Sequence, residues 1–153
     1  MPSFTAADAG MMRLALKEAE EAAKIGEVPV GAVAVWEGEV ISAARNRRET
    51  DKSALSHAEL LAIGEACERL GGWRLHKLTL YVTLEPCPMC AGAIINARIA
   101  RVVFGASDPK AGCFGSVADF CALPFNHRPL VEGGLLGEES ALLLRAFFSA
   151  LRS

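Results

Sequence analysis

Two short motifs contain the residue types that bind transition metals. The first is His57-Ala58-Glu59, and the second is Pro86-Cys87-Pro88-Met89-Cys90. Cys87 and Cys90 lie three positions apart, so on a helix their thiols share one face and can bind one ion. With a ring nitrogen of His57 they make three protein ligands, which leaves a tetrahedral Zn²⁺ one position for water. The motifs therefore predict a catalytic site with one Zn²⁺ per chain.

Glu59 has a different predicted role. Two positions after His57 on a helix, its side chain points about 200° around the axis, which is a poor position for a fourth ligand. At a helix start, however, both side chains can still reach a common site. A carboxylate beside water activated by zinc can accept a proton and deliver it elsewhere. We predict that Glu59 is catalytic and acts as a proton shuttle.

Two other interpretations of the cysteines are weaker. A structural zinc site is closed by four protein ligands, and the remaining cysteines form no second C-x-x-C pair (Cys67, Cys113 and Cys121). A thioredoxin-type redox motif at Cys87 and Cys90 would leave His57 and Glu59 unexplained. The joint pattern therefore favours catalytic zinc.

Helices and strands must bring the two motifs together. Apolar spacing and end signals predict helices from Thr5 to Gly26, from near Ser56 to Gly71-Gly72, from Pro86-Cys87-Pro88 onward and from about Glu138. Apolar, β-branched runs predict strands at Val28–Trp36, through Val40 and Ile41, at Leu78–Leu84, at Ala100–Phe104 and near Leu130. The segment Arg45–Leu55 is polar and irregular. This order predicts an α/β fold, a three-layer α/β/α sandwich around a mixed five-stranded sheet.

Length and composition exclude several classes of protein. The chain has 153 residues, of which 52% are hydrophobic and 22% charged, and we expect residues 1–153 to form one domain. The formal charge of −2 excludes a nucleic-acid binder that relies on bulk positive charge. No apolar run approaches the roughly 20 residues of a membrane span, and no export signal is evident. We therefore expect a cytoplasmic protein that does not bind membranes, with its five cysteines reduced.

His57-Ala58-Glu59 followed by Pro86-Cys87-x-x-Cys90 resembles the signature of zinc-dependent nucleoside and nucleobase deaminases. From about Met12 to Arg152 the chain further resembles the bacterial tRNA-specific adenosine deaminases, the TadA family. The similar stretches include Glu27-Val28-Pro29-Val30-Gly31-Ala32-Val33, Asn46-Arg47, Leu80–Cys87, Cys90–Ala93, Arg101–Ala106, Gly115-Ser116 and Asn126-His127-Arg128.

The resemblance implies a cytidine-deaminase-like fold and a homodimer. It also implies hydrolysis of adenosine to inosine at the wobble position of a tRNA anticodon stem-loop. Zinc-activated water would attack C6 of the flipped adenine, and Glu59 would move the protons. The segment Ser53-Ala54-Leu55-Ser56 departs from the Asp-Pro-Thr-Ala common in the family.

Substrate contacts follow from the same resemblance. Asn46 matches a residue that hydrogen-bonds the target base, although it could also be a turn residue. Asp108 and Lys110 match contacts to flanking nucleotides, or could serve only to solvate a loop. Asn126 matches another RNA contact, and Phe148, which follows Phe147, is predicted to stack on a base.

Two other functions remain open on sequence grounds. The zinc chemistry is shared with deaminases of a free base or nucleoside, such as guanine or cytidine. A protein of another class, a catalytically silent RNA-binding subunit, could keep zinc for structure. Glu59 discriminates against the silent subunit, which would need no proton shuttle.

Overall fold

The computed structural model describes residues 3–152. Met1, Pro2 and Ser153, which the predicted domain includes, lie outside the described residues. The elements in chain order are α1 (Ala6–Lys24), β1 (Gly31–Trp36), β2 (Glu39–Arg45), α2 (Ala58–Leu70), β3 (Leu78–Leu84), α3 (Pro88–Asn96), β4 (Arg101–Ala106), the short 3₁₀ helix η1 (Phe120–Ala122), β5 (Leu130–Gly133) and α4 (Gly137–Arg152).

The strands form one mixed sheet in the order β2-β1-β3-β4-β5. β1 is antiparallel to both β2 and β3, whereas β3, β4 and β5 run parallel to one another. The β1–β2 hairpin turns at Glu37 and Gly38, whose φ angles of 49° and 83° suit the twist of a tight hairpin. Helical connections join the parallel strands β3 and β4, as such crossovers require. The predicted mixed sheet is therefore confirmed.

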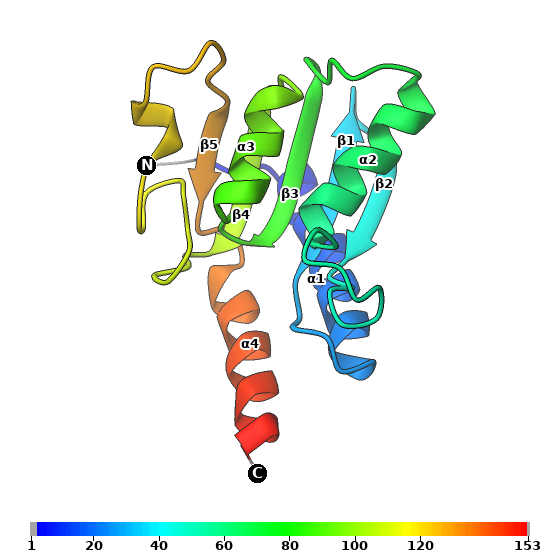
Figure 1. The fold of residues 1–153 in the computed structure, drawn as a ribbon, viewed down its shortest axis with the longest axis vertical. Helices are drawn as coiled ribbons and strands as arrows, with labels where there is room; N and C mark the ends of the chain where they lie inside the picture. The colour runs from blue at the N-terminus through cyan, green and yellow to red at the C-terminus, as the bar shows by residue number, and fades with distance from the viewer. Residues whose placement is uncertain (1–2, 153) are drawn as a thin grey trace.

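Helices cover both faces of the sheet, which confirms the predicted three layers (Figure 1). On one face, α2 and α3 bury a cluster that includes Ala62, Ile94, Leu80 and Val102. On the other face, α1 packs Met12 and Leu16 against side chains of β1, β3 and β4. Because both faces are covered, the interior strand β1 is an almost continuous run of apolar residues.

A polar network ties α1 to three strands of the sheet. Asp8 caps the start of α1 with Thr5 and accepts hydrogen bonds from Tyr81 Oη at 2.6 Å and Arg101 Nη1 at 2.9 Å. Arg101 Nε also donates to Glu132 at 2.7 Å. The hydrogen bond from Arg101 holds the pKa of Asp8 well below its usual range. This network joins the first helix to β3, β4 and β5.

Several predicted boundaries are corrected by the structure. β1 begins at Gly31 rather than Val28, because Pro29 has no amide hydrogen to donate and Val30 instead accepts from the amide of Asn46 at 3.0 Å. β4 runs from Arg101 to Ala106 rather than from Ala100 to Phe104, whereas α2 begins at Ala58, close to the predicted start near Ser56.

The last helix, α4, begins on the α1 side of the sheet and then extends beyond it (Figure 1). Ser140 is its only buried residue among those described. Leu142, Phe148 and Leu151 are exposed along its length. Within residues 3–152, no helix has both the length and the apolar character needed to cross a bilayer.

Candidate active site

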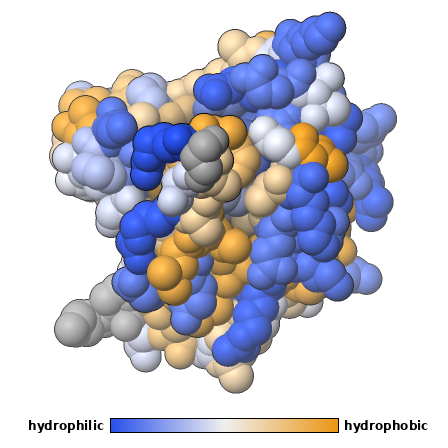
Figure 2. All heavy atoms as spheres, turned by 90° about the horizontal axis from the view of Figure 1, so that it is seen from below, coloured by the Kyte–Doolittle hydropathy of each residue, from blue (hydrophilic) through white to orange (hydrophobic). Residues whose placement is uncertain are grey.

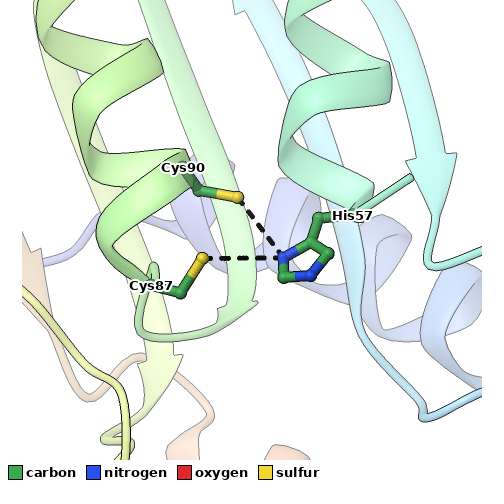
Figure 3. A group of neighbouring side chains, drawn as sticks. All are labelled: His57, Cys87 and Cys90. Atoms are coloured by element: carbon green, nitrogen blue, oxygen red, sulfur yellow. Dashed lines mark hydrogen bonds between the residues drawn. The ribbon is translucent and has the colours of Figure 1, made fainter. Parts of the chain in front are cut away.

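The two motifs meet where α2 and α3 begin, at the end of the sheet where β3 ends (Figure 1). His57 is the N-cap residue of α2, and Cys87 is the N-cap residue of α3, with Pro88 next in the helix. The Sγ atoms of Cys87 and Cys90 each lie 3.6 Å from Nδ1 of His57 (Figure 3). All three potential ligand atoms lie within 4.8 Å of one another, which is close enough to surround one ion.

The charges of these groups favour a cation between them. A hydrogen bond from Cys90 and the nearby His57 lower the pKa of Cys87 to about 4, against the effect of burial. The hydrogen bond to Cys87, together with burial, raises the pKa of Cys90. The hydrogen bond with Cys87 also raises the pKa of His57. Two adjacent thiolates can both ionise only beside a compensating cation, so this donor set fits a divalent metal such as zinc.

Glu59 lies in the first turn of α2 and lines the same pocket. Only 4% of its surface is exposed, and burial raises the pKa of its carboxyl group to about 7. A hydrogen bond with Cys90 and the nearby His57 act in the opposite direction. The carboxyl group therefore lies beside the cluster of His57, Cys87 and Cys90, at a pKa where it can gain or lose a proton near neutral pH.

The pocket has apolar walls and a few polar groups, as small-molecule sites commonly do. Its cavity of about 160 Å³ is lined by Val28, Val30, Asn46, Arg48, His57, Ala58, Glu59, Leu84, Glu85, Cys87, Asp108 and Ala111. The surface at this end of the molecule, from which α4 also extends, has a central band of hydrophobic side chains bordered by hydrophilic ones (Figure 2). The arrangement can hold a flat apolar group and present water, a cation and a proton carrier to one edge of it.

Two of the five predicted substrate-binding residues line the pocket, and the other three are exposed outside it. Asn46 and Asp108 line the pocket, and Lys110 is exposed on the loop that carries Asp108. Asn46 is buried; its Nδ2 donates to the carbonyl of Val28 at 3.2 Å, and its Oδ1 accepts from the amide of Arg48 at 3.1 Å. Asn126 and Phe148 are exposed and do not line this pocket.

Sequence reasoning did not single out the apolar walls of the pocket. Val28, Val30 and Leu84 line the pocket, whereas the sequence predicts them only as strand residues. Only their position could have indicated this role, because these residues lie at ends of strands that border the helix starts carrying the potential metal ligands. The sequence also does not indicate a role for Glu27 or Glu85, because an acidic residue at the end of an apolar strand is ordinary, and only the structure shows that both carboxyl groups are buried.

Comparison with known proteins shows which family of enzymes the chain belongs to. The model of the MafB19-like deaminase family matches residues 7–152, so the chain belongs to this family of deaminases. The tRNA-specific adenosine deaminase of Bacillus subtilis is 54% identical over 142 residues, which cover 92% of this chain and 88% of the relative. Within the deaminases, the chain is therefore a member of the tRNA-specific adenosine deaminase family.

Solved structures agree with this assignment. A structure from a study of A-to-I editing by tRNA:A34 deaminases has a TM-score of 0.86 and 48% identity, and the match covers 88% of this chain and 99% of that one. A guanine deaminase from Bacillus subtilis has a TM-score of 0.63 and 32% identity, covering 94% and 92% of the two chains. The fold is thus shared with a free-base deaminase, but both identity and structural agreement are higher with the tRNA deaminase.

Proposed function

We propose that this protein deaminates adenosine to inosine at the wobble position of a tRNA anticodon. The observation that carries the proposal is the convergence of His57, Cys87, Cys90 and Glu59 on one pocket. The high identity to tRNA-specific adenosine deaminases selects the substrate. In the overall reaction, adenosine and water give inosine and ammonia.

Zn²⁺ is the metal that this site would hold, one ion per chain, with Nδ1 of His57 and the Sγ atoms of Cys87 and Cys90 as ligands. When bound, zinc would act as a Lewis acid and lower the pKa of bound water to near neutrality. The two thiolates balance its charge, and their positions at the N-terminus of α3 stabilise the ionised form.

Glu59 moves the protons of the reaction. Its carboxylate accepts a proton from the attacking water and transfers it to the adenine ring, and a second transfer protonates the departing amine. Burial raises its pKa to about 7, so both protonation states are accessible near neutral pH. Its position in the first turn of α2 places the carboxyl group on the wall of the pocket that would receive the base.

Residues at the pocket mouth bind the substrate in this proposal. Asn46 uses one amide hydrogen to bond Val28 and one lone pair of Oδ1 to bond Arg48. Its second amide hydrogen and second lone pair hydrogen-bond the target base. Asp108 and Lys110 contact flanking nucleotides, Asn126 contacts RNA farther out, and Phe148 stacks on an unpaired base.

Arg48 is suited to bind a phosphate beside the target nucleotide. Its neighbours in sequence are engaged in ion pairs, Arg45 with Glu18 and Arg47 with Asp51. Arg48 lines the pocket, and no salt bridge to it occurs among residues 3–152.

The decisive experiment gives zinc-loaded protein an anticodon stem-loop with adenosine at the wobble position, and inosine is measured in the product. Matched substrates are the same stem-loop with guanosine there, free guanine, and cytidine. Inosine in the adenosine stem-loop alone supports the proposal. Turnover of guanine or cytidine with an unchanged stem-loop would establish a free-base or nucleoside deaminase instead.

A silent RNA-binding subunit is the remaining alternative. It predicts stem-loop binding with no turnover of any of these substrates. The environment of Glu59 favours the enzyme, because burial raises the pKa of its carboxyl group to about 7, and a silent subunit has no use for a buried group that can exchange protons near neutral pH.

We further propose that the chain forms one domain and acts as a homodimer in the cytoplasm. Exposed apolar side chains such as Phe125 and Leu130 support an association between copies. All five cysteines are free, which suits a reducing compartment. Light scattering at micromolar concentration tests the dimer, and a monomeric mass contradicts it.

A further inference from the structure

Two buried glutamates outside the proposed chemistry hold the loops that border the pocket. Glu27 follows α1 and Glu85 follows β3, and their surfaces are only 1% and 2% exposed. Neither forms a salt bridge with a lysine or arginine among the described residues. Burying a carboxylate without a cation is costly unless hydrogen bonds replace its water shell. Both side chains obtain those bonds from loop backbone.

Glu27 holds the loop that follows β2. Its Oε1 accepts from the amide of Glu49 at 3.1 Å, and its Oε2 accepts from the amide and the hydroxyl of Thr50, both at 2.6 Å. Burial raises the pKa of Glu27, but these hydrogen bonds outweigh it and leave the pKa below its ordinary value. The same loop carries Asn46 and Arg48 and leads directly to His57.

Glu85 holds the loop on the other side of the pocket. Its Oε1 accepts from the amide of Asp108 at 3.0 Å, and its Oε2 accepts from the amides of Phe114 and Ser116 at 3.0 and 3.1 Å. The hydroxyl of Ser116 also donates to Oε1. The loop passes so close that a Cβ on Gly112 would overlap the carboxyl group.

We propose that Glu27 and Glu85 are paired positioning residues that fix the two opposite rims of the pocket. This inference rests on the proposed function and extends it. Each carboxylate accepts hydrogen bonds from backbone amides of a segment that forms turns but belongs to no helix or strand. The rim carrying Asn46 and the rim carrying Asp108 are thereby ordered before the substrate arrives, so binding does not have to order them.

Neither glutamate takes part in the chemistry. Glu85 lines the pocket, but both of its oxygens are occupied by loop donors. Glu27 does not line the pocket at all. Loss of either side chain should therefore weaken substrate binding more than it slows the chemical step.

The test uses zinc-loaded Glu27→Gln and Glu85→Gln variants, with Glu68→Gln on the exposed side of α2 as the matched control. Glutamine keeps the size of the side chain, but its amide group replaces one acceptor oxygen with a donor. Backbone hydrogen exchange is followed by mass spectrometry. Single-turnover deamination of the adenosine stem-loop separates the half-saturating concentration from the maximal rate.

We expect exchange to accelerate at residues 47–53 only in Glu27→Gln and at residues 107–118 only in Glu85→Gln. The half-saturating stem-loop concentration should rise at least about tenfold in each, the factor that one charged hydrogen bond can supply. The maximal rate and the zinc content should stay close to those of the control. Unchanged exchange in both loops, acceleration throughout the protein, or a lower maximal rate with unchanged half-saturation would overturn the proposal.

A milder pair of variants covers the case in which a glutamine variant does not fold. Thr50→Val and Ser116→Ala remove only the hydroxyl that donates to each carboxylate, and they should accelerate exchange in the same two loops. Exchange also separates the two proposals. If wild-type protein leaves every stem-loop unchanged, the proposed function fails, while the loop-specific exchange pattern still decides the positioning role.

Discussion

Glu59→Gln tests whether a single buried carboxyl group is both a source of activity and a cost to stability. Glutamine has nearly the same shape but cannot ionise. In wild type, burial raises the pKa of Glu59 from 4.5 to about 7. The folded protein therefore holds this proton more tightly than the unfolded chain does. As a result, the free energy of unfolding falls as the pH rises from about 4.5 to about 7.

The size of the effect follows from that shift. One pKa unit corresponds to about 1.4 kcal/mol, so the full penalty on the ionised form is about 3 kcal/mol. Between pH 5 and pH 8, about 2.5 kcal/mol of this should appear as a relative gain in stability for Glu59→Gln. The comparison is made in a chelator, because a bound cation would itself favour the carboxylate.

Urea unfolding at both pH values measures the gain, and Glu68→Gln on the same helix serves as the control. The zinc-loaded Glu59→Gln variant should keep one zinc per chain and lose about 10²–10⁴-fold in single-turnover rate, the usual contribution of general acid–base catalysis. A stability difference that does not change with pH would refute the argument from burial. Loss of zinc in the variant would show that Glu59 is a ligand instead of a proton carrier.

Three further predictions concern the metal, the substrate and the fold. Cys90→Ser should lower the zinc content well below one per chain, measured by atomic emission, because a hydroxyl is a weaker zinc ligand than a thiolate. Arg48→Ala should weaken stem-loop binding and reduce its dependence on salt, measured by fluorescence anisotropy, whereas Arg47→Ala should change both less. Asp8→Asn should lower the free energy of unfolding at pH 7 by about 3 kcal/mol in urea, because it leaves Arg101 partly buried without a full partner. The pKa of Asp8 is lowered, so this difference should shrink as the pH falls below about 4; a difference that stays constant would contradict the assignment.

The sequence was sufficient to predict the layers, the mixed sheet and the convergence of the two motifs. Apolar periodicity and glycine or proline stops mark the elements, and a hairpin followed by helical crossovers leaves little choice of strand direction. His57 and Cys87 could be placed at helix starts for the same reason. Whether each preceded its helix as an N-cap could not be predicted, because neither is a common capping residue.

The rest of the site depends on contacts between residues far apart in the chain. Glu85 contacts Ser116 across 31 positions and Glu27 contacts Thr50 across 23, and no periodic pattern encodes such loop contacts. The placement of Asn126 and Phe148 beyond the pocket lining also depends on the path of loops and on α4, which leaves the sheet. Amphipathic spacing predicted that last helix but could not predict what its apolar side chains would contact.

The ion pair between Asp8 and Arg101 spans 93 positions of the chain. During synthesis on the ribosome, the first helix must therefore wait until most of the polypeptide has emerged before its acidic cap acquires its basic partner. In a nascent chain halted before Arg101, the apolar face of α1 can already pack on β1 and β3, and Asp8 can already accept from Tyr81. The buried carboxylate of Asp8, however, still lacks its cation, so the docking of α1 stays incomplete until β4 is made.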